Sequence, residues 1–259
     1  MIRKRRIAGL VSGVLRAALR RRPRTAGVIL AAGSGTRMGG DVPKQFLPIL
    51  GVPILIRSVL AFAKTPEIDE IVIVTRNSDM DAVQKLVSEY GITSKSVSVI
   101  AGGDTRQRSA LLGVEATSKK CRFVAVHDAA RCMVTPDLIS SVVSAAYKHR
   151  AASAASPVHD TVKRLDKRGR IAETVDRAKL VAAATPQAFD KNYYIAVAAY
   201  AEKKGTVVTD DNGLFEAVGQ SVFAVDCGDG NFKVTTPGDL IRAEAAIRAR
   251  ENREKESDG

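Results

Sequence analysis

The chain has 259 residues, of which 45% are hydrophobic and 26% are charged. This composition is typical of a globular protein and excludes disorder as the main state of the chain. No apolar run approaches the ~20 residues that a membrane-spanning helix needs, so we expect no transmembrane segment. The three cysteines contain no CxxC pair, which excludes a disulfide framework and a zinc signature and favours a reducing, cytoplasmic location.

The basic charge is concentrated at the N-terminus. The net charge is +12, and residues 1–25 carry nine Lys and Arg side chains and no acidic one, which leaves +3 for the rest of the chain. We predict that residues 1–25 form a basic N-terminal extension. It is either an unstructured segment without a function of its own or a segment for plastid-type targeting, secretion or surface binding. The extension has no aromatic side chain that could stack on bases, so we expect no specific nucleic-acid partner.

Strand and helix patterns alternate from residue 26 onward. Short apolar runs predict buried strands, and apolar residues at helical spacing predict the helices between them. Strands that are buried on both faces and separated by helices indicate a mainly parallel sheet with right-handed crossovers. The expected fold class is therefore α/β, a three-layer, Rossmann-like arrangement. The predicted strands are 27–31, 70–75, 96–101, 122–127 and 151–157, and the predicted helices are 53–63, 80–90, 106–117 and 136–149.

The alternation ends after residue 157. Residues 158–175 predict two short strands around a turn closed by Gly169, and we expect a protruding β-ribbon arm over about 158–177. Such a ribbon is barely stable alone, which favours packing on another subunit. We expect a single domain over 26–250 and a polar tail over 251–259 that frays. The remaining predicted elements are helices over 191–203, 211–218 and 237–250 and a strand over 221–226.

A glycine-rich loop follows the first predicted strand. Gly33 and Gly35 allow backbone N–H groups to approach phosphate oxygens, at the sheet edge where open α/β sheets bind ligands. Arg37 and Lys44 come next, and cations at this place neutralise charge on a phosphate during transfer. The loop lacks the Gly-Lys-Ser/Thr of a Walker A motif, and Met38 stands where a dinucleotide fingerprint needs Gly or Ala. The loop therefore predicts transfer chemistry at a phosphate group.

Further motifs follow this loop in a recognisable order. They are Pro43-Lys44-Gln45, Gly102-Gly103-Asp104-Thr105-Arg106 with Ser109, His127-Asp128-Ala129-Ala130-Arg131, Asp160-Thr161-Val162-Lys163 with Thr174-Val175-Asp176-Arg177, Thr185-Pro186-Gln187, Thr209-Asp210 and Asn231-Phe232-Lys233-Val234-Thr235. Over about residues 26–245 the set resembles the 2-C-methyl-D-erythritol 4-phosphate cytidylyltransferase family of the sugar-phosphate nucleotidyltransferases. The resemblance implies transfer of a cytidylyl group from CTP to the polyol phosphate in the non-mevalonate isoprenoid pathway, with Mg²⁺ as the cofactor.

The resemblance also implies roles for individual residues. Arg37 and Lys44 would stabilise the transition state at the α-phosphorus, and Arg177 and Lys233 would hold the substrate phosphate for in-line attack. Thr161 and Arg177 lie on the predicted arm and would reach the neighbouring site of a homodimer. The implied nucleotide-binding residues are Ala31, Ala32, Gly33, Gly35, Asp104 and Ser109. The implied substrate-binding residues are Asp128, which would also lie near the magnesium ion, Arg131, Thr161, Thr185 and Thr209.

The chain departs from the family pattern at two places, and other functions stay open. Cys132 follows Arg131 where the family has proline, and Asp211-Asn212-Gly213 replaces Glu-Ala-Ser. We interpret His127 as a packed or hydrogen-bonded residue rather than an acid–base group. The alternatives are a ribitol 5-phosphate cytidylyltransferase, a polyanion-binding module driven by the basic extension and a nicotinamide oxidoreductase. The motifs at 160–163 and 174–177 favour the methylerythritol enzyme over the ribitol enzyme.

Overall fold

The computed structural model describes residues 22–33 and 42–258. Its strands are β1 (Thr25–Leu30), β2 (Pro48–Ile49), β3 (Val52–Pro53), β4 (Ile68–Thr75), β5 (Ser96–Ala101), β6 (Phe123–Asp128), β7 (Ala151–Pro157), β8 (Lys163–Leu165), β9 (Ile171–Thr174), β10 (Val181–Asp190) and β11 (Phe223–Asp226). Its α-helices are α2 (Ile54–Lys64), α3 (Met80–Glu89), α4 (Arg106–Glu115), α5 (Pro136–His149), α6 (Lys191–Lys204), α7 (Asn212–Glu216) and α8 (Pro237–Asp258), and its 3-10 helices are η2 (Lys44–Phe46), η3 (Asn77–Asp79) and η4 (Arg177–Lys179).

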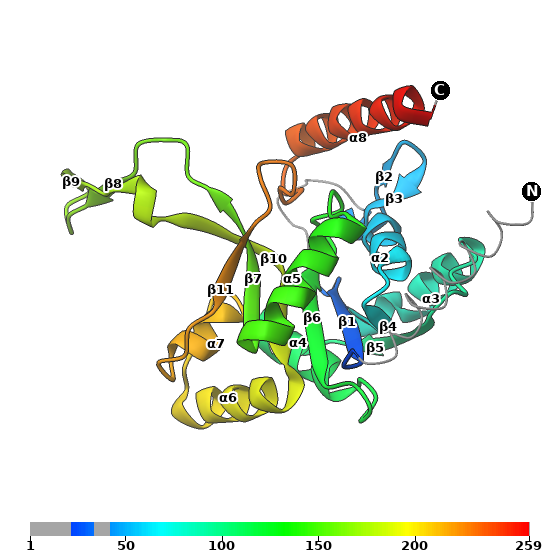
Figure 1. The fold of residues 1–259 in the computed structure, drawn as a ribbon, viewed down its shortest axis with the longest axis horizontal. Helices are drawn as coiled ribbons and strands as arrows, with labels where there is room; N and C mark the ends of the chain where they lie inside the picture. Colours follow the sequence, from blue (N-terminus) through cyan, green and yellow to red (C-terminus); the bar gives the residue numbers. More distant parts are fainter. Residues whose placement is uncertain (1–21, 34–41, 259) are drawn as a thin grey trace, which may run out of the picture.

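A seven-stranded sheet forms the centre of the molecule, in the order β11-β7-β10-β6-β1-β4-β5 (Figure 1). Strand β1 pairs in parallel with both β4 and β6, β4 pairs in parallel with β5, and β11 pairs in parallel with β7. Strand β10 alone among these lies antiparallel, between β6 and β7. The predicted α/β class with a mainly parallel sheet is confirmed.

Helices cover both faces of this sheet, which gives the predicted three layers. In β1, Ile29 packs with apolar residues of α2 and α5 on one face, and Val28 packs with α4, α6 and α7 on the other. The two residues face opposite layers because successive side chains of a strand point to opposite faces of the sheet. Gly27 lets α2 approach closely, because a Cβ atom there would lie 2.5 Å from Cδ1 of Phe62. Both layers therefore pack directly on the strand that leads into the glycine-rich loop.

The predicted ribbon is present and extends away from the sheet as an arm (Figure 1). Strands β8 and β9 pair antiparallel across the turn that contains Gly169, whose φ of +77° favours glycine. Leu165 and Ile171 on these strands are 58% and 67% exposed. The arm thus carries apolar side chains that nothing in the described chain covers.

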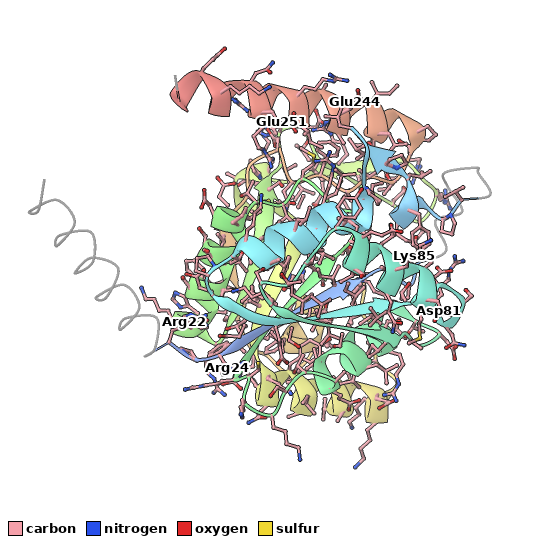
Figure 2. All side chains as sticks on the ribbon, turned by 90° about the vertical axis from the view of Figure 1, so that its right-hand side faces the viewer. Arg22, Arg24, Asp81, Lys85, Glu244 and Glu251 are labelled. Carbon is pink, nitrogen blue, oxygen red and sulfur yellow. The ribbon has the colours of Figure 1, made fainter. Side chains whose placement is uncertain are left out.

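Three predictions about secondary structure were wrong or incomplete. The helix predicted to end near residue 250 is longer, since α8 continues to Asp258 across one end of the molecule, away from Arg22 and Arg24 (Figure 2), and the fraying of its end stays a prediction. Strand β10 was not predicted, and Pro186, which lacks an N–H donor, lies where its pairing with β7 is interrupted. The short β2-β3 hairpin was also missed.

The boundary of the basic extension also needs correction. Arg22 forms an ion pair with Asp69, and Thr25 is the first residue of β1, so the fold begins before residue 26. Residues 1–21 lie outside the described residues. None of the described helices is long and apolar enough to cross a membrane.

Candidate active site

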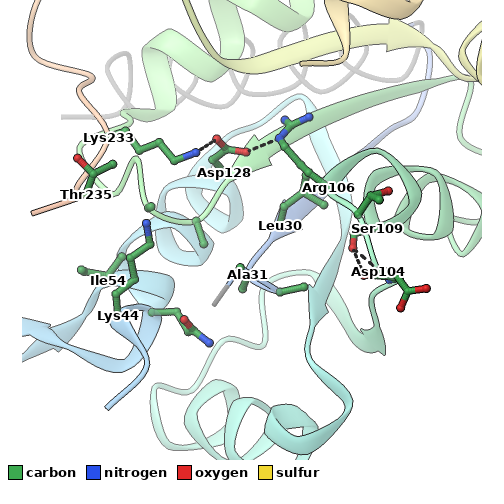
Figure 3. Close-up of a pocket in the computed structure, with 17 residues that line it drawn as sticks. Leu30, Ala31, Lys44, Ile54, Asp104, Arg106, Ser109, Asp128, Lys233 and Thr235 are labelled. Carbon is green, nitrogen blue, oxygen red and sulfur yellow. Dashed lines mark hydrogen bonds and ion pairs between the residues drawn. The ribbon is translucent and has the colours of Figure 1, made fainter. Parts of the chain in front are cut away.

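A cavity of about 470 Å³ opens at the carboxyl ends of β1 and β6, beside the loop that joins β5 to α4 (Figure 3). Strand order reverses here, because the chain places β4 and β5 on one side of β1 and β6 on the other. Open α/β sheets bind ligands at such switch points. The residues that line the cavity are Leu30, Ala31, Ala32, Gly33, Lys44, Gln45, Ile54, Gly103, Asp104, Thr105, Arg106, Ser109, Asp128, Ala129, Ala130, Lys233 and Thr235.

One wall of the cavity is built from two loops in close contact. Ser109 accepts a hydrogen bond from the Gly103 amide and donates one to its carbonyl, at 3.1 and 3.2 Å. A Cβ atom at Gly102 would lie 2.9 Å from the Cβ atom of Ala32, so glycine allows the loops to touch. Thr105 caps α4 by accepting from the Arg108 amide, which directs the positive end of the helix dipole to the same wall. This wall suits a nucleotide with negatively charged phosphates.

The cavity also holds a cluster of charges around Asp128, which ends β6. The Asp128 carboxylate accepts from Nε of Arg106 at 3.1 Å and from Nζ of Lys233 at 2.7 Å (Figure 3). Although burial raises the pKa of Asp128, the two cations outweigh it and hold the pKa well below its usual range. Lys44 points to the same region and donates from Nζ to the Val234 carbonyl at 3.2 Å. The cavity therefore holds a carboxylate that the surrounding positive charge keeps ionised.

A buried acid lies behind Arg106. Nη1 of Arg106 donates to Oδ2 of Asp211 at 2.8 Å, and the Tyr194 hydroxyl donates to Oδ1 of Asp211 at 2.6 Å. Burial raises the pKa of Asp211, and Arg106 opposes that rise. Burial and the neighbouring Asp211 carboxylate raise the pKa of Tyr194 as well, so its hydroxyl stays protonated and donates.

His127 and Thr185 lie beneath the cavity rather than in it. His127 is fully buried and Thr185 is 3% exposed. The Thr185 hydroxyl accepts from the Asp128 amide at 3.0 Å and lies 3.0 Å from Nδ1 of His127. Burial lowers the pKa of His127 to about 3. His127 is therefore a neutral, packed residue, as predicted, and Thr185 fixes the end of β6.

The structure brings together most of the predicted site residues. Eight of them line the one cavity: Ala31, Ala32, Gly33, Lys44, Asp104, Ser109, Asp128 and Lys233. Gly35 and Arg37 lie outside the described residues.

Five other predicted residues do not line this cavity. Arg131 donates to the carbonyls of Asn231 and Ala183, and Thr185 lies beneath the cavity. Thr161 and Arg177 are exposed on the arm, where Arg177 donates to the His159 carbonyl. Thr209 is exposed in the loop before α7. Contacts of these five residues with substrate stay predictions.

Sequence reasoning missed the roles of Arg106, Gln45 and Thr235. Arg106 belongs to a recognised motif, but no role was predicted for it. Its ion pairs with Asp211 and Asp128 place it at the centre of the charge cluster. Gln45 is 3% exposed and donates to Asp79 at 3.1 Å, which holds η2 against η3. Thr235 lines the same cavity as Lys233. It is the last residue of the motif that contains Lys233, and this position was the signal from which its role could have been predicted.

The fold and the cavity together define a nucleotidyltransferase. Known proteins narrow the class further: the sequence profile of the family "IspD: 2-C-methyl-D-erythritol 4-phosphate cytidylyltransferase" matches residues 25–249. The enzyme of that name from Synechococcus sp. (strain CC9902) is 44% identical over 223 residues, which cover 86% of this chain and 97% of the relative. The one from Caldanaerobacter subterraneus is 38% identical, covering 85% and 97%.

Solved structures agree with the sequence relatives. The 4-diphosphocytidyl-2C-methyl-D-erythritol synthase of Anaerococcus prevotii superposes with a TM-score of 0.77 at 29% identity, covering 86% of this chain and 98% of that one. The 2-C-methyl-D-erythritol 4-phosphate cytidylyltransferase of Thermus thermophilus superposes with a TM-score of 0.68 at 30% identity, covering 85% and 98%. The chain belongs to the 2-C-methyl-D-erythritol 4-phosphate cytidylyltransferase family.

Proposed function

We propose that the protein transfers the cytidylyl group of CTP to 2-C-methyl-D-erythritol 4-phosphate, which yields 4-diphosphocytidyl-2-C-methyl-D-erythritol and pyrophosphate for the non-mevalonate isoprenoid pathway. The observation that carries this proposal is the cavity itself. It joins the glycine-rich end of β1 and the α4 N-terminus to a cluster of cations around one carboxylate. Membership of the family supplies the identity of the two substrates.

The chemistry requires charge neutralisation and alignment more than a base. An oxygen of the polyol phosphate attacks the α-phosphorus of CTP, one P–O bond forms, and the bond to the pyrophosphate leaving group breaks. A phosphate monoester oxygen is already nucleophilic, so no side chain needs to remove a proton, and the buried neutral His127 is consistent with this. Lys44 and Lys233 both line the cavity and contribute positive charge where negative charge develops in the transition state.

Lys233 and Lys44 are placed by the same loop. The segment before α8 carries Lys233, and its Val234 carbonyl accepts from Lys44, which lies in η2. Arg131 anchors the loop from below through the Asn231 carbonyl at 3.0 Å. Together with the ion pair of Lys233 with Asp128, these contacts hold both ammonium groups in the cavity before substrate arrives, which reduces the entropy lost on ordering them.

The residues of the cavity suit a magnesium ion that arrives with the nucleotide. Mg²⁺ is commonly held by one or two carboxylates together with substrate phosphates. Asp128 offers an ionised carboxylate in the cavity, and residues 22–33 and 42–258 contain no group of three potential metal ligands that would form a separate protein site. We propose that Asp128 holds the ion, which when bound neutralises phosphate oxygens of the nucleotide.

We also propose a homodimer in which the arm completes the neighbouring site. Leu165 and Ile171 give the arm an apolar surface to bury. Thr161 and Arg177 lie at its base, are exposed, and do not line their own cavity. A partner would therefore receive a hydroxyl and a guanidinium group from this arm. A cytoplasmic location fits the proposal, because Cys121, Cys132 and Cys227 are unpaired.

The test is release of pyrophosphate from CTP with each candidate acceptor. We expect magnesium-dependent turnover with 2-C-methyl-D-erythritol 4-phosphate. The kcat/KM for ribitol 5-phosphate should be lower by about two orders of magnitude, the discrimination that a pocket gives against an acceptor that differs by a methyl or a hydroxyl group. Equal or faster turnover of ribitol 5-phosphate would overturn the substrate assignment. No pyrophosphate release with either acceptor would overturn the reaction.

A further inference from the structure

A chain of buried hydrogen bonds runs from the core to the cavity. It starts at the Tyr194 hydroxyl on α6, passes through Asp211 before α7, and reaches Arg106 at the start of α4. Arg106 then donates to Asp128 at the end of β6. The three links measure 2.6, 2.8 and 3.1 Å, so each lies within the range of a formed hydrogen bond.

Exposure rises along these hydrogen bonds from Tyr194 to Arg106. Tyr194 is fully buried, the Asp211 side chain is 1% exposed, and the Arg106 side chain, which lines the cavity, is 30% exposed. Tyr194 and Asp211 thus lie too deep to touch substrate, and whatever they contribute passes through Arg106.

Two carboxylates determine where the Arg106 guanidinium lies. Nε bonds Asp128 and Nη1 bonds Asp211, while Nη2 is buried without a hydrogen-bond partner among residues 22–33 and 42–258. If Asp211 moved, Arg106 would keep only its bond to Asp128, a group that must stay free to contact ligand. The bond to Asp211 is therefore the one that anchors Arg106 to the protein core.

The neighbours of Asp211 leave it little freedom. Its amide donates to Gln187 of β10 at 3.0 Å, and its two carboxylate oxygens accept from Tyr194 and Arg106. The Tyr194 hydroxyl is the single neutral donor to this carboxylate among the described residues. The ring of Tyr194 packs among Phe189 and Phe215, so the hydroxyl is presented from a rigid apolar cluster.

We propose that Tyr194 and Asp211 are positioning residues for the transfer reaction, acting through Arg106 to hold the Asp128 carboxylate in its productive orientation. The proposal rests on the proposed function for its catalytic consequence, but its structural part stands without it. Removal of the Tyr194 hydroxyl should loosen Asp211, then Arg106, then Asp128, with no loss of a group that touches substrate.

The experiment compares Tyr194→Phe with the matched control Tyr193→Phe. Tyr193 is the adjacent residue and also packs on Phe215, but its hydroxyl has no hydrogen-bond partner within the described residues. The first measurement is proton exchange at the Arg106 Nε–H group by NMR in the substrate-free protein, with the signal assigned by its loss in Arg106→Lys. We expect exchange about tenfold faster in Tyr194→Phe, the scale of one hydrogen bond to a charged group, and no change in Tyr193→Phe.

The second measurement is turnover with CTP and 2-C-methyl-D-erythritol 4-phosphate. We expect kcat to fall about tenfold in Tyr194→Phe while both KM values change less than about twofold, because the reacting groups are misaligned and substrate contacts remain. Asp211→Asn should lower kcat further, since it removes the charge that anchors Arg106. Thermal unfolding of each variant checks that the fold is intact.

The outcomes separate this proposal from the proposed function. Unchanged Arg106 exchange and unchanged kcat in a folded Tyr194→Phe variant would overturn the positioning role. A similar loss of kcat in Tyr193→Phe would also overturn it, because general loosening of α6 would then explain the effect. If the wild type releases no pyrophosphate, the proposed function fails, and the NMR comparison still decides whether Tyr194 positions Arg106.

Discussion

Replacement of Arg22 by alanine removes an ion pair that joins the end of the basic extension to the fold. Arg22 contacts the Asp69 carboxylate through Nη1 at 2.8 Å and Nη2 at 3.2 Å, and Nη2 also donates to the Pro66 carbonyl at 2.6 Å. The two side chains are 17% and 19% exposed. Exposed pairs contribute about 0–1 kcal/mol, and breaking a buried pair costs about 3–5 kcal/mol. Because the burial of this pair lies between these two cases, we expect the free energy of unfolding to fall by about 2–3 kcal/mol.

This loss is measurable by denaturation. For a domain of this size, a change of 1 kcal/mol shifts the Tm by about 2–4 °C, so the Tm of Arg22→Ala should fall by about 4–12 °C. Lys119→Ala is the control, because Lys119 is exposed and its side chain forms no ion pair with any of the described residues. A chain that begins at Arg22 should keep wild-type stability, and one that begins at Thr25 should show the loss.

A double-mutant cycle assigns the effect to the pair. Asp69 also accepts from the Thr25 amide at 2.8 Å, and an asparagine there could still accept this bond through its carbonyl oxygen. In an Asp69→Asn background, Arg22→Ala should therefore cost much less than in the wild type. An equal cost in both backgrounds, or a cost under about 0.5 kcal/mol in the wild type, would refute the reasoning.

Three further predictions concern pH, catalysis and assembly. Burial lowers the pKa of His127 to about 3, so His127 takes up a proton near its usual pKa of about 6.5 in the unfolded chain but not in the folded chain. The free energy of unfolding should therefore be at its full value above pH 6.5 and fall by about 2 kcal/mol between pH 7.5 and pH 5, which urea denaturation measures. A His127 imidazole that titrates near 6.5 by NMR would contradict this. Lys44→Ala should lower kcat and kcat/KM together by about a hundredfold, whereas a rise in the KM for CTP alone would show ground-state binding only. Mixing Lys44→Ala with Arg177→Ala protomers should restore about a quarter of wild-type activity after subunit exchange, because half of the dimers then hold one intact site of the two. No recovery of activity after verified exchange would contradict a site shared between subunits.

The parallel strands could be predicted because burial on both faces leaves a local signal. Val28 and Ile29 alternate between two hydrophobic clusters, and both had to be apolar for β1 to lie at the centre of the sheet. Once the strands were identified, the motifs at their carboxyl ends had to meet at one edge. This is why Gly33, Asp104 and Asp128, which are distant in the sequence, were expected in one site and line one cavity.

Strand β10 and the C-terminal helix lacked such a signal. The sequence of β10 contains Pro186, a residue usually excluded from central strands, and the strand tolerates it where its antiparallel pairing with β7 is interrupted. The end of α8 has few apolar residues, so no periodic pattern marks it. Its Glu, Arg and Lys residues have good helix propensity, and no glycine or proline interrupts them before Gly259, so the helix continues.

The charge cluster shows what a motif conveys about a site and what it leaves out. Arg106 and Asp211 are separated by 105 residues, so no local pattern predicts their ion pair. Thr185 and Arg131 belong to recognised motifs, yet here their side chains bond the Asp128 amide and the Asn231 carbonyl. A short motif thus marks residues that build a site as well as residues that face its ligand, because a carboxylate such as Asp128 needs both a place in the cavity and groups that keep it there. Which residues have which task follows from burial: Lys44, Lys233 and Asp128 line the cavity, and Thr185 lies beneath it.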